Sequence, residues 1–591
     1  MPDKVFRKSA SSQLPKALLT FSLLLLLALI GRLWVLQRMS DAVLGCRWCS
    51  IPRALSADLP LLALFGAVFC FSYLIPRRWW SLPWRGLAIT GVIVYLVDIF
   101  VTAQFATRLS LSDVRIYLGQ PEVVWDLVGA QPWWQSLLAV GGVIVLAFTL
   151  WPKPAFRRSP VAVSVIALLW ASTALLGWMI PSPSYVHDWA LRNVITANLD
   201  NGISSPYSVA TLDRLQEVAD ALPYSCRQGD ATRENIVVLI VESWSTYHSS
   251  LWSGLNDWTP KLDQLARDNI HFTRFHAGGF TTNDGLTSLL TGRQITLPVT
   301  PPSQAQPFET RWNLENTLPR ALAEYGYRSR FITSGNLSFT RKGDWLQSIG
   351  FNGMEGHDHA SYDGIPRQHF DSVPDDVLYA RARKAIRELE KKPKPYFTVI
   401  ETVSSHHPFI HPYTGEQEEE AVMRFVDQSA ADFITDLKTD DFFVNGMLIV
   451  VSDHRAMTFV SRNETKLFGR SAASHIPAFI MTGDSTADTR DDLFHQADLP
   501  TTLLSRVAKR ACASEWRRDM LAENPTSPCC ILHARGDHRD RIDVFCTNGE
   551  GTVRIDGDES RFLESDGLSR TQRRALLDRI AIQRLPAIGH R

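Results

Sequence analysis

The stretch NIVVLIVES, residues 235–243, decides the fold of the larger part of this chain. It holds an unbroken apolar run rich in β-branched side chains, which is typical of a strand buried on both faces of a parallel sheet. Similar runs lie at 329–332, 396–402 and 446–452, and amphipathic helical patterns separate them. Strands that alternate with helices predict an α/β domain with a central, mostly parallel sheet.

Polar residues follow two of these strands directly. Glu242 follows the first strand, and Asp453 and His454 follow the strand at 446–452. Because ligands of such sheets bind at the carboxyl ends of the strands, these side chains are candidates for one common site. Each of them alone is equally well explained as a helix cap, an ion-pair partner or a turn residue. The hypothesis of a metal site therefore depends on their convergence.

A glycine-bearing loop supplies a third element of the candidate site. It reads GGFTTND at 278–284 and leads into a helical pattern that ends at LLTG, residues 289–292. Thr282 is expected at the N-terminus of that helix, where backbone N–H groups and the helix dipole favour a phosphate or a developing alkoxide. A threonine nucleophile needs such help because its hydroxyl is barely ionised. A plain threonine N-cap is the structural alternative.

The first 180 residues concentrate apolar side chains in runs long enough to be considered as membrane spans, each of which needs about 20 residues. These runs lie at 15–36, 59–76, 86–105, 134–151 and 160–180. Lys and Arg residues gather before the first run, between the second and third, and between the fourth and fifth, which predicts that these segments are cytoplasmic. Everything after about residue 181 is then expected in the periplasm or at the cell exterior.

Charge and cysteine content indicate which partners and which cellular compartment are expected. Lys+Arg and Asp+Glu both number 61, so the chain lacks the cationic excess of a nucleic-acid-binding protein. Five cysteines fall in the external part, where an oxidising compartment permits disulfides, and their pairing is left open. They are Cys226, Cys512, Cys529, Cys530 and Cys546.

Asp98 lies inside the third apolar run, where a carboxylate is either functional or paired with a polar neighbour.

Five short motifs together resemble the alkaline phosphatase and sulfatase superfamily, specifically its lipoteichoic acid synthase-like branch with five N-terminal spans. The motifs are IVES at 240–243, GGFTTND at 278–284, SSHHPF at 404–409, VSDH at 451–454 and ADLPTTLL at 497–504. The resemblance implies a transmembrane domain of five helices at 1–181, a juxtamembrane linker at 182–234 and an extracytoplasmic sulfatase-like catalytic domain at 235–591. It also implies that the last domain ends in a small C-terminal antiparallel sheet.

The resemblance further implies that Glu242, Thr282, Asp453 and His454 bind one divalent cation. This mixture of carboxylates, hydroxyl and imidazole suits manganese or zinc, and magnesium is compatible. In sulfatase-like sequences the nucleophile stands nine residues before the Thr of the LLTG motif, which selects Thr282 over Thr281. The residues after Thr282 lack the Pro and Arg of the formylglycine motif, so sulfate-ester hydrolysis is disfavoured.

Further residues are expected on the substrate side. By resemblance, His406 could protonate the leaving hydroxyl or deprotonate the acceptor, and His407 could replace it. Arg341 and Lys342 stand where such enzymes contact the substrate phosphate, although the histidine and the tryptophan-arginine arrangement of Gram-positive lipoteichoic acid synthases are missing. His495 stands where relatives place a histidine at the edge of the site, and helix capping explains this region equally well.

The function expected from this resemblance is a multi-pass inner-membrane transferase. It would move phosphoglycerol from the lipid phosphatidylglycerol to an extracytoplasmic glycan or polyglycerolphosphate acceptor through a covalent Thr282 intermediate. A phosphoethanolamine transferase with the same nucleophile and metal geometry is the alternative. An inactive relative that acts as a membrane scaffold is the alternative from another class.

Overall fold

The structure is a computed structural model of the 591-residue chain, and its described residues form two compact units. Apart from a few isolated positions, the described ranges are 14–39, 47–75, 78–110, 160–180, 191–200, 207–220, 233–294, 317–484, 486–509, 517–523, 530–536 and 540–584. The first unit is helical and takes most of the first 200 residues, and the second holds the rest of the chain with both sheets.

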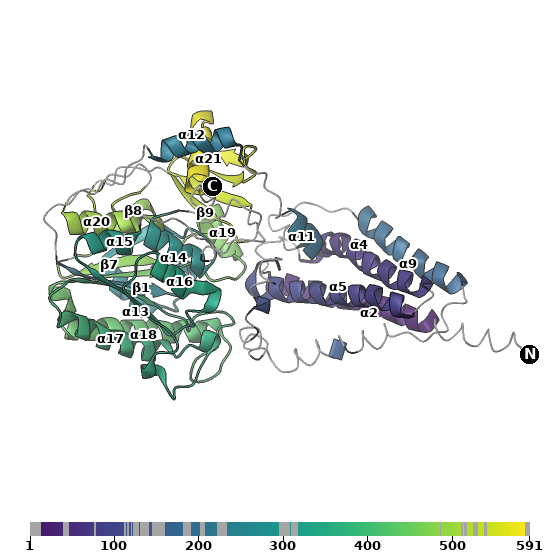
Figure 1. Ribbon diagram of the computed structural model, residues 1–591, viewed down its shortest axis with the longest axis horizontal. Coiled ribbons are helices and arrows are strands. Elements are labelled where there is room, and N and C mark those ends of the chain that lie inside the picture. The colour runs from purple at the N-terminus through teal and green to yellow at the C-terminus, as the bar shows by residue number, and fades with distance from the viewer. Residues whose placement is uncertain are drawn as a thin grey trace, which may run out of the picture. The chain divides into compact units, whose positions relative to one another are not determined.

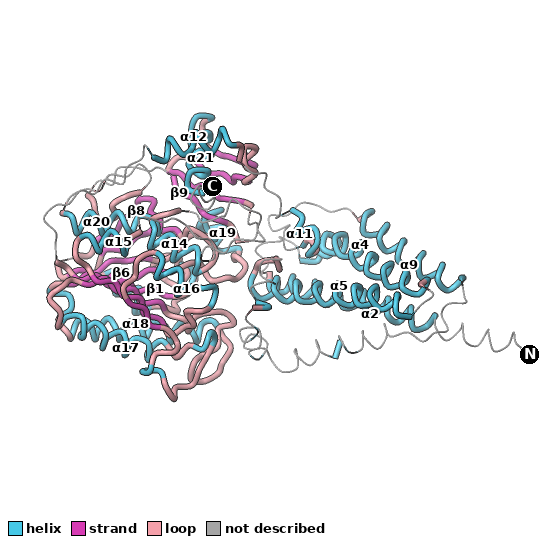
Figure 2. Tube along the Cα trace, viewed as in Figure 1, coloured by secondary structure: helices cyan, strands magenta, loops and turns pink. Residues whose placement is uncertain are grey.

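Long helices dominate the first unit (Figure 2). They are α2 (Leu14–Arg38), α4 (Arg47–Leu74), α5 (Arg78–Phe105) and α9 (Pro160–Met179), followed by the short α11 (Val194–Asp200). The four long helices coincide with four of the five predicted spans, and the span at 134–151 lies almost wholly outside the described residues.

Within the described ranges, two helical segments are long and apolar enough to cross a bilayer. They are Ser50–Phe69, with 20 residues, and Trp79–Phe105, with 27 residues. A bilayer-spanning helix needs about 20 residues. The apolar part of α9, Ser164–Met179, is shorter. Two candidate spans are therefore found, and five are not confirmed.

Asp98 has a charged partner within the helical unit. Arg108 Nε lies 3.1 Å from Asp98 Oδ1, and the same carboxylate oxygen accepts a hydrogen bond from the backbone N–H of Leu109 at 3.1 Å. Both side chains are buried. This pairing agrees with a structural role for Asp98, because a buried carboxylate is tolerated when it is paired and hydrogen-bonded.

The second unit is built on a mixed sheet of eight strands in the order β4-β3-β5-β1-β6-β7-β2-β8. Their bounds are β1 (Asn235–Val241), β2 (Ile270–His276), β3 (Arg328–Thr333), β4 (Gly353–Glu355), β5 (Tyr396–Glu401), β6 (Gly446–Ser452), β7 (Ala478–Thr482) and β8 (Asp488–His495). All neighbouring pairs are parallel except those of β7, which runs antiparallel to both β6 and β2. The expectation of a mostly parallel sheet is refined to a mixed one.

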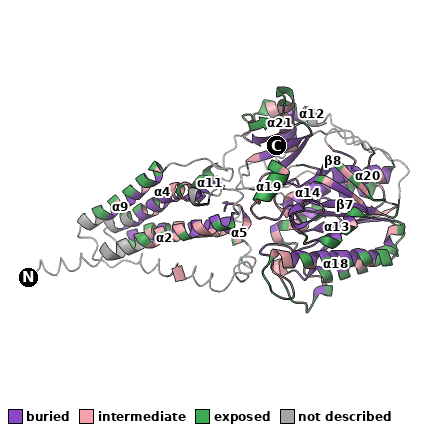
Figure 3. Cartoon of the chain, turned by 180° about the vertical axis from the view of Figure 1, so that it is seen from behind, coloured by how far each residue is buried: buried purple, intermediate pink, exposed green. Residues whose placement is uncertain are grey.

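Helices cover both faces of this sheet (Figure 1). The alternate side chains Ile236, Val238 and Ile240 of β1 pack in one apolar cluster with α14 (Thr282–Thr291), α15 (Leu318–Glu324), α16 (Lys342–Ser348) and α20 (Leu499–Ala508). The other side chains of β1 pack in a second cluster with α13 (Pro260–Arg267), α17 (Asp375–Glu390) and α18 (Glu419–Thr439). The central strands are therefore buried on both faces, as Figure 3 shows, which explains their unbroken apolar sequence.

A smaller antiparallel sheet follows in the C-terminal part of the second unit, in the order β12-β11-β10-β9. Its strands are β9 (Cys530–Ala534), β10 (Arg541–Cys546), β11 (Gly549–Arg554) and β12 (Arg561–Asp566), and a disulfide joins Cys530 to Cys546 across β9 and β10. Helix α21 (Arg570–Arg584) packs on α12 (Val209–Asp220), and the remaining helix is α19 (Arg462–Phe468). The expected small C-terminal antiparallel sheet is confirmed.

Candidate active site

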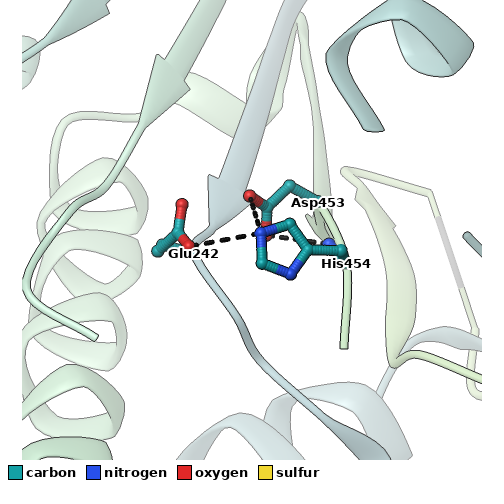
Figure 4. A group of neighbouring side chains, drawn as sticks. All are labelled: Glu242, Asp453 and His454. Carbon is teal, nitrogen blue, oxygen red and sulfur yellow. Dashed lines mark hydrogen bonds and ion pairs between the residues drawn. The ribbon is translucent and has the colours of Figure 1, made fainter. Parts of the chain in front are cut away.

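Glu242 and Asp453 leave the sheet side by side because their strands are paired. β1 and β6 are parallel neighbours, and Val241 and Ser452 are partners in their last register position. The next residue of each strand therefore lies at the same edge, and His454 follows Asp453. Ligand atoms of Glu242, Asp453 and His454 all lie within 4.8 Å of one another, and all three residues are buried (Figure 4).

Backbone and hydroxyl groups orient the two carboxylates. The backbone N–H groups of Ser243 and His454 both donate to Asp453 Oδ1, at 2.9 and 2.8 Å. The Ser243 hydroxyl donates to Glu242 Oε1 at 2.9 Å. Asp453 Oδ2 accepts no hydrogen bond from any described residue and lies 3.2 Å from His454 Nε2. One oxygen of Asp453 is thus fixed by the backbone, and the other faces the centre of the cluster.

The imidazole of His454 is also held in a defined orientation. Its Nδ1 lies 2.8 Å from the carbonyl oxygen of Arg455, so the proton on Nδ1 is donated to the backbone. Nε2 then faces Glu242 Oε1 at 3.4 Å. The Arg455 guanidinium is in turn held by both oxygens of Glu464, at 2.8 and 2.9 Å. A hydrogen-bond partner such as the Arg455 carbonyl oxygen is typical of a metal-binding histidine, because it fixes which ring nitrogen carries the proton.

The electrostatics of this cluster favour a bound cation. Burial and the neighbouring charge of Glu242 raise the pKa of Asp453 to about 7. Burial disfavours the imidazolium of His454, but the Asp453 and Glu242 carboxylates outweigh it and raise the pKa of His454 to about 10. The two buried carboxylates thus favour a positive charge beside them, which the His454 imidazolium supplies in the metal-free protein. A divalent cation meets this need, and the oxygen and nitrogen donors present are of the types that manganese, zinc and magnesium accept.

Thr282 joins this cluster from the first turn of α14. Its Oγ1 lies 3.3 Å from Glu242 Oε2 and 3.4 Å from His454 Nε2. The helix cap is provided by the neighbouring Thr281, whose Oγ1 accepts from the Asp284 backbone N–H and donates to Asp284 Oδ2 at 2.9 Å. The N-cap alternative therefore applies to Thr281, and the hydroxyl of Thr282 faces the three candidate ligands.

Gly285 allows helix α14 to lie close to the end of β6. An added Cβ at Gly285 would lie 2.2 Å from the carbonyl oxygen of Asp453, closer than any side-chain atom can approach. Only glycine allows this contact, because it has no Cβ. The separation between Thr282 and the candidate metal ligands therefore depends on Gly285.

His406 lies near the cluster, close enough for the charges of Asp453 and His454 to act on it. Its Nδ1 is 2.6 Å from the carbonyl oxygen of His407, and the charges of His454, Asp453 and Lys342 all act on it. Burial is the main cause that lowers the pKa of His406 to about 4, so its neutral form predominates at pH 7. His407 is buried as well, and its ring packs against Phe409 at 5.2 Å between centroids.

The two predicted cationic residues have different surroundings. Lys342 is mostly buried, and its Nζ contacts both oxygens of Glu401 at 2.7 and 2.8 Å. Arg341 is exposed and pairs with Asp344 at 3.0 Å. Glu401 is the last residue of β5 and is buried beside Asp453, whose charge acts on it. The sequence interpretation missed Glu401, although its place at the end of an apolar strand is the same signal that identified Glu242.

His495 is fully buried and engaged with the backbone through both ring nitrogens. Nδ1 accepts from the Ala497 N–H at 2.9 Å, and Nε2 lies 3.1 Å from the carbonyl oxygen of Leu532 in β9. These contacts agree with the capping alternative. The adjacent Gln496 has the closer relation to the site, because its amide donates to the carbonyl oxygens of Ser452 and Asp453 at 2.8 and 2.7 Å.

Comparison with known proteins identifies the family of this domain. Residues 234–508 match the family model described as Sulfatase, which covers β1 through α20 and every candidate site residue. These residues form a sulfatase-superfamily domain. A solved protein of the alkaline phosphatase superfamily from Vibrio parahaemolyticus shares the fold, with a TM-score of 0.51 at 21% identity, over 64% of this chain and 94% of that one.

Curated relatives of the sulfatase-superfamily domain are named phosphoglycerol transferase I. The protein of Xanthomonas euvesicatoria pv. vesicatoria is 25% identical over 246 residues, which are 38% of this chain and 34% of that protein. The protein of Escherichia fergusonii is 25% identical over 430 residues, 68% of this chain and 52% of that protein. The chain thus spans about a third to a half of the length of these relatives.

Proposed function

We propose that this protein is a membrane-anchored transferase that moves phosphoglycerol from phosphatidylglycerol to an extracytoplasmic glycan or polyglycerolphosphate acceptor. The observation that carries the proposal is the position of Thr282 Oγ1, 3.3 Å from Glu242 and 3.4 Å from His454 at the start of a helix. Similarity to proteins named phosphoglycerol transferase I supports the choice of head group, and the lipid donor is part of the proposal.

The reaction would proceed in two displacements at phosphorus. Thr282 Oγ1 attacks the phosphate of phosphatidylglycerol and gives up its proton to water. The bond between phosphorus and the diacylglycerol oxygen breaks, and that oxygen leaves with the electron pair and takes a proton from water. Phosphoglycerol is then esterified to Thr282. An acceptor hydroxyl attacks the same phosphorus, the bond to Oγ1 breaks, and Thr282 regains a proton.

Glu242, Thr282, Asp453 and His454 would hold the divalent cation that sulfatase-superfamily enzymes use. When bound, such an ion lowers the pKa of a coordinated hydroxyl and neutralises charge on phosphoryl oxygens. The backbone N–H groups at the start of α14 would add to this stabilisation, since the N-terminus of a helix favours negative charge. The donor set suits manganese or zinc, and magnesium is compatible.

His406 would serve the second displacement. Its neutral form is favoured by burial, so it is suited to accept the proton of the acceptor hydroxyl rather than to protonate the departing diacylglycerol. Lys342 would contact phosphate oxygens from the same side, and Glu401 would hold its ammonium in place. Arg341, His407 and His495 have contacts that give them supporting roles at most.

The proposed location is the inner membrane, with the sulfatase-like domain outside the cytoplasm. The helical unit supports anchoring with two segments long and apolar enough to span a bilayer. The Cys530–Cys546 disulfide supports an oxidising compartment, where such bonds persist. Anchoring would keep the nucleophile at the lipid surface, where the donor and the diacylglycerol product both reside.

The test uses the full chain in detergent micelles with manganese and phosphatidylglycerol labelled in its head group. We expect label on the peptide that contains Thr282, and no label after Thr282→Ala. Thr281→Ala is the matched control, because it removes only the helix cap, at a cost of about 1 kcal/mol, and keeps the labelled peptide. Label transferred only from phosphatidylethanolamine would establish the alternative donor. No label from either lipid would overturn the enzymatic proposal and favour a scaffold.

A further inference from the structure

A tight turn places a second histidine beside His406. The turn is His369–Asp371, and it lies between the end of β4 and the start of α17. The ring of His369 lies 6.4 Å from that of His406 between centroids, with an angle of 51° between the planes. Phe370, the next residue, packs its ring edge-to-face on His406 at 4.8 Å. The turn therefore packs against the His406 ring.

The backbone of this turn is strained. Phe370 and Asp371 both have a φ of 56°, in the left-handed region that residues with a side chain rarely adopt. Strain of this kind persists only where the surroundings hold it, and it gathers at functional sites. Phe370 is held between the rings of His406 and Phe339, each at 4.8 Å, and its carbonyl oxygen accepts from the Asn336 N–H at 3.0 Å.

Hydrogen bonds from Arg367 also hold this turn. The Arg367 guanidinium donates to the carbonyl oxygens of His357, Asp371 and Tyr362, at 2.8, 3.0 and 3.1 Å. These bonds hold the turn in one conformation. The backbone that carries His369 is therefore held by these hydrogen bonds, and the ring itself makes none within the described part of the chain.

The His369 ring is half-buried, and no described residue makes a hydrogen bond or an ion pair with it. Burial first, and the neighbouring His406 second, lower the pKa of His369 to about 4. The ring is therefore neutral at pH 7, with one nitrogen that donates a hydrogen bond and one that accepts. A hydroxyl, which also donates and accepts, is the group that such a ring satisfies best.

The two imidazoles are close neighbours, with ring centroids 6.4 Å apart. A hydrogen bond from a ring nitrogen to an oxygen is about 2.8 Å long, so a small group that reaches His406 also comes within reach of the His369 ring. We propose that His369 binds a free hydroxyl of the glycerol head group of the phospholipid donor, while the neighbouring His406 remains available to the acceptor. The inference rests on the proposed function, and it makes His369 a substrate-binding residue that distinguishes glycerol from head groups without hydroxyls.

The test pairs a variant of the protein with a variant of the donor. The full chain in detergent micelles is assayed for diacylglycerol release from phosphatidylglycerol and from phosphatidylpropanol, whose head group has no free hydroxyl. We expect His369→Ala to raise KM about tenfold for phosphatidylglycerol, as loss of one hydrogen bond worth a tenfold change implies, and to leave KM for phosphatidylpropanol unchanged. His369→Gln, which keeps a donor and an acceptor, is expected to recover part of the loss.

His359→Ala is the matched control, because His359 is a half-buried histidine of the same segment whose ring faces Glu355 at 3.5 Å. It should change neither KM. Equal losses with both donors in His369→Ala, or no loss with either, would overturn the inference. If His369→Ala does not fold, as thermal unfolding would reveal, His369→Phe, which keeps a ring but cannot bond a hydroxyl, takes its place in the same comparison. The proposed function fails separately, when the wild-type protein releases no diacylglycerol from phosphatidylglycerol.

Discussion

Lys342 Nζ contacts both carboxylate oxygens of Glu401, at 2.7 and 2.8 Å, and both side chains are largely shielded from solvent. Fifty-nine positions separate the two residues along the chain, and the pair ties the segment after β3 to the end of β5. The ammonium is thereby fixed next to His406, on which its charge acts.

We expect Glu401→Gln to lower both the thermal stability and kcat/KM for the lipid donor. Breaking a buried ion pair on one side leaves an uncompensated charge and costs about 3–5 kcal/mol. The double variant Lys342→Met/Glu401→Leu should recover most of the stability, because an apolar pair of similar volume avoids that penalty. It should not recover turnover. A double variant with wild-type kcat/KM would show that Lys342 has no part in binding phosphate.

Asp453→Asn tests whether the cluster at the ends of β1 and β6 is built for a cation. In the metal-free protein, burial and the neighbouring Glu242 raise the pKa of Asp453, so we expect replacement of this carboxyl by an amide to raise apo-protein stability by about 1–3 kcal/mol. The stabilisation that manganese gives the wild-type protein should disappear, since a ligand stabilises only a fold that binds it. Thermal unfolding with chelator and with added manganese measures both effects. An equal manganese shift in both proteins would contradict the assignment.

Buried histidines of the second unit make stability depend on pH. Burial lowers the pKa of His475 to about 4 and that of His495 to about 3, whereas an unfolded histidine titrates near 6.5. The unfolded chain therefore binds more protons than the folded one. The free energy of unfolding has its highest value above about pH 6.5 and falls as the pH drops towards 4. Each histidine should contribute about 2 kcal/mol to the loss at pH 5.

Chemical unfolding of wild type and of His475→Gln from pH 7.5 to pH 5 isolates this effect. The two proteins share the metal cluster, so the difference between their slopes reports His475 together with its effect on the neighbouring His276. We expect the shallower slope in the variant. Identical slopes would mean that His475 takes up its proton in the folded state as easily as in the unfolded one.

The core of the candidate site could be predicted from the sequence because its signals are local. Glu242 and Asp453 directly follow unbroken apolar strands, and parallel pairing of those strands is enough to bring them together. Thr282 was identified by its spacing in the LLTG helix. The structure adds why the adjacent hydroxyl is not equivalent: Thr281 is occupied by the capping box with Asp284.

Other parts of the fold and the site left no such signal. Four of the eight residues of β8 carry charged side chains, so it lacks the apolar pattern of a buried strand. The antiparallel direction of β7 depends on how the chain returns after β6, which no short motif specifies. His369 lies in an irregular segment, and only tertiary packing of Phe370 brings it to His406. His495 was placed near the site by its motif, but its ring bonds to the backbone of β9.

The contact of Gly285 with the carbonyl oxygen of Asp453 has a consequence for how such an enzyme can change over evolutionary time. The helix that carries the proposed nucleophile lies directly against the backbone of a candidate metal ligand, with no side chain in between to absorb a shift. A substitution that moves either segment must move the other by the same amount. Divergence in substrate preference is therefore expected in the turns around His369 and Lys342, which can be rebuilt without disturbing the reaction centre.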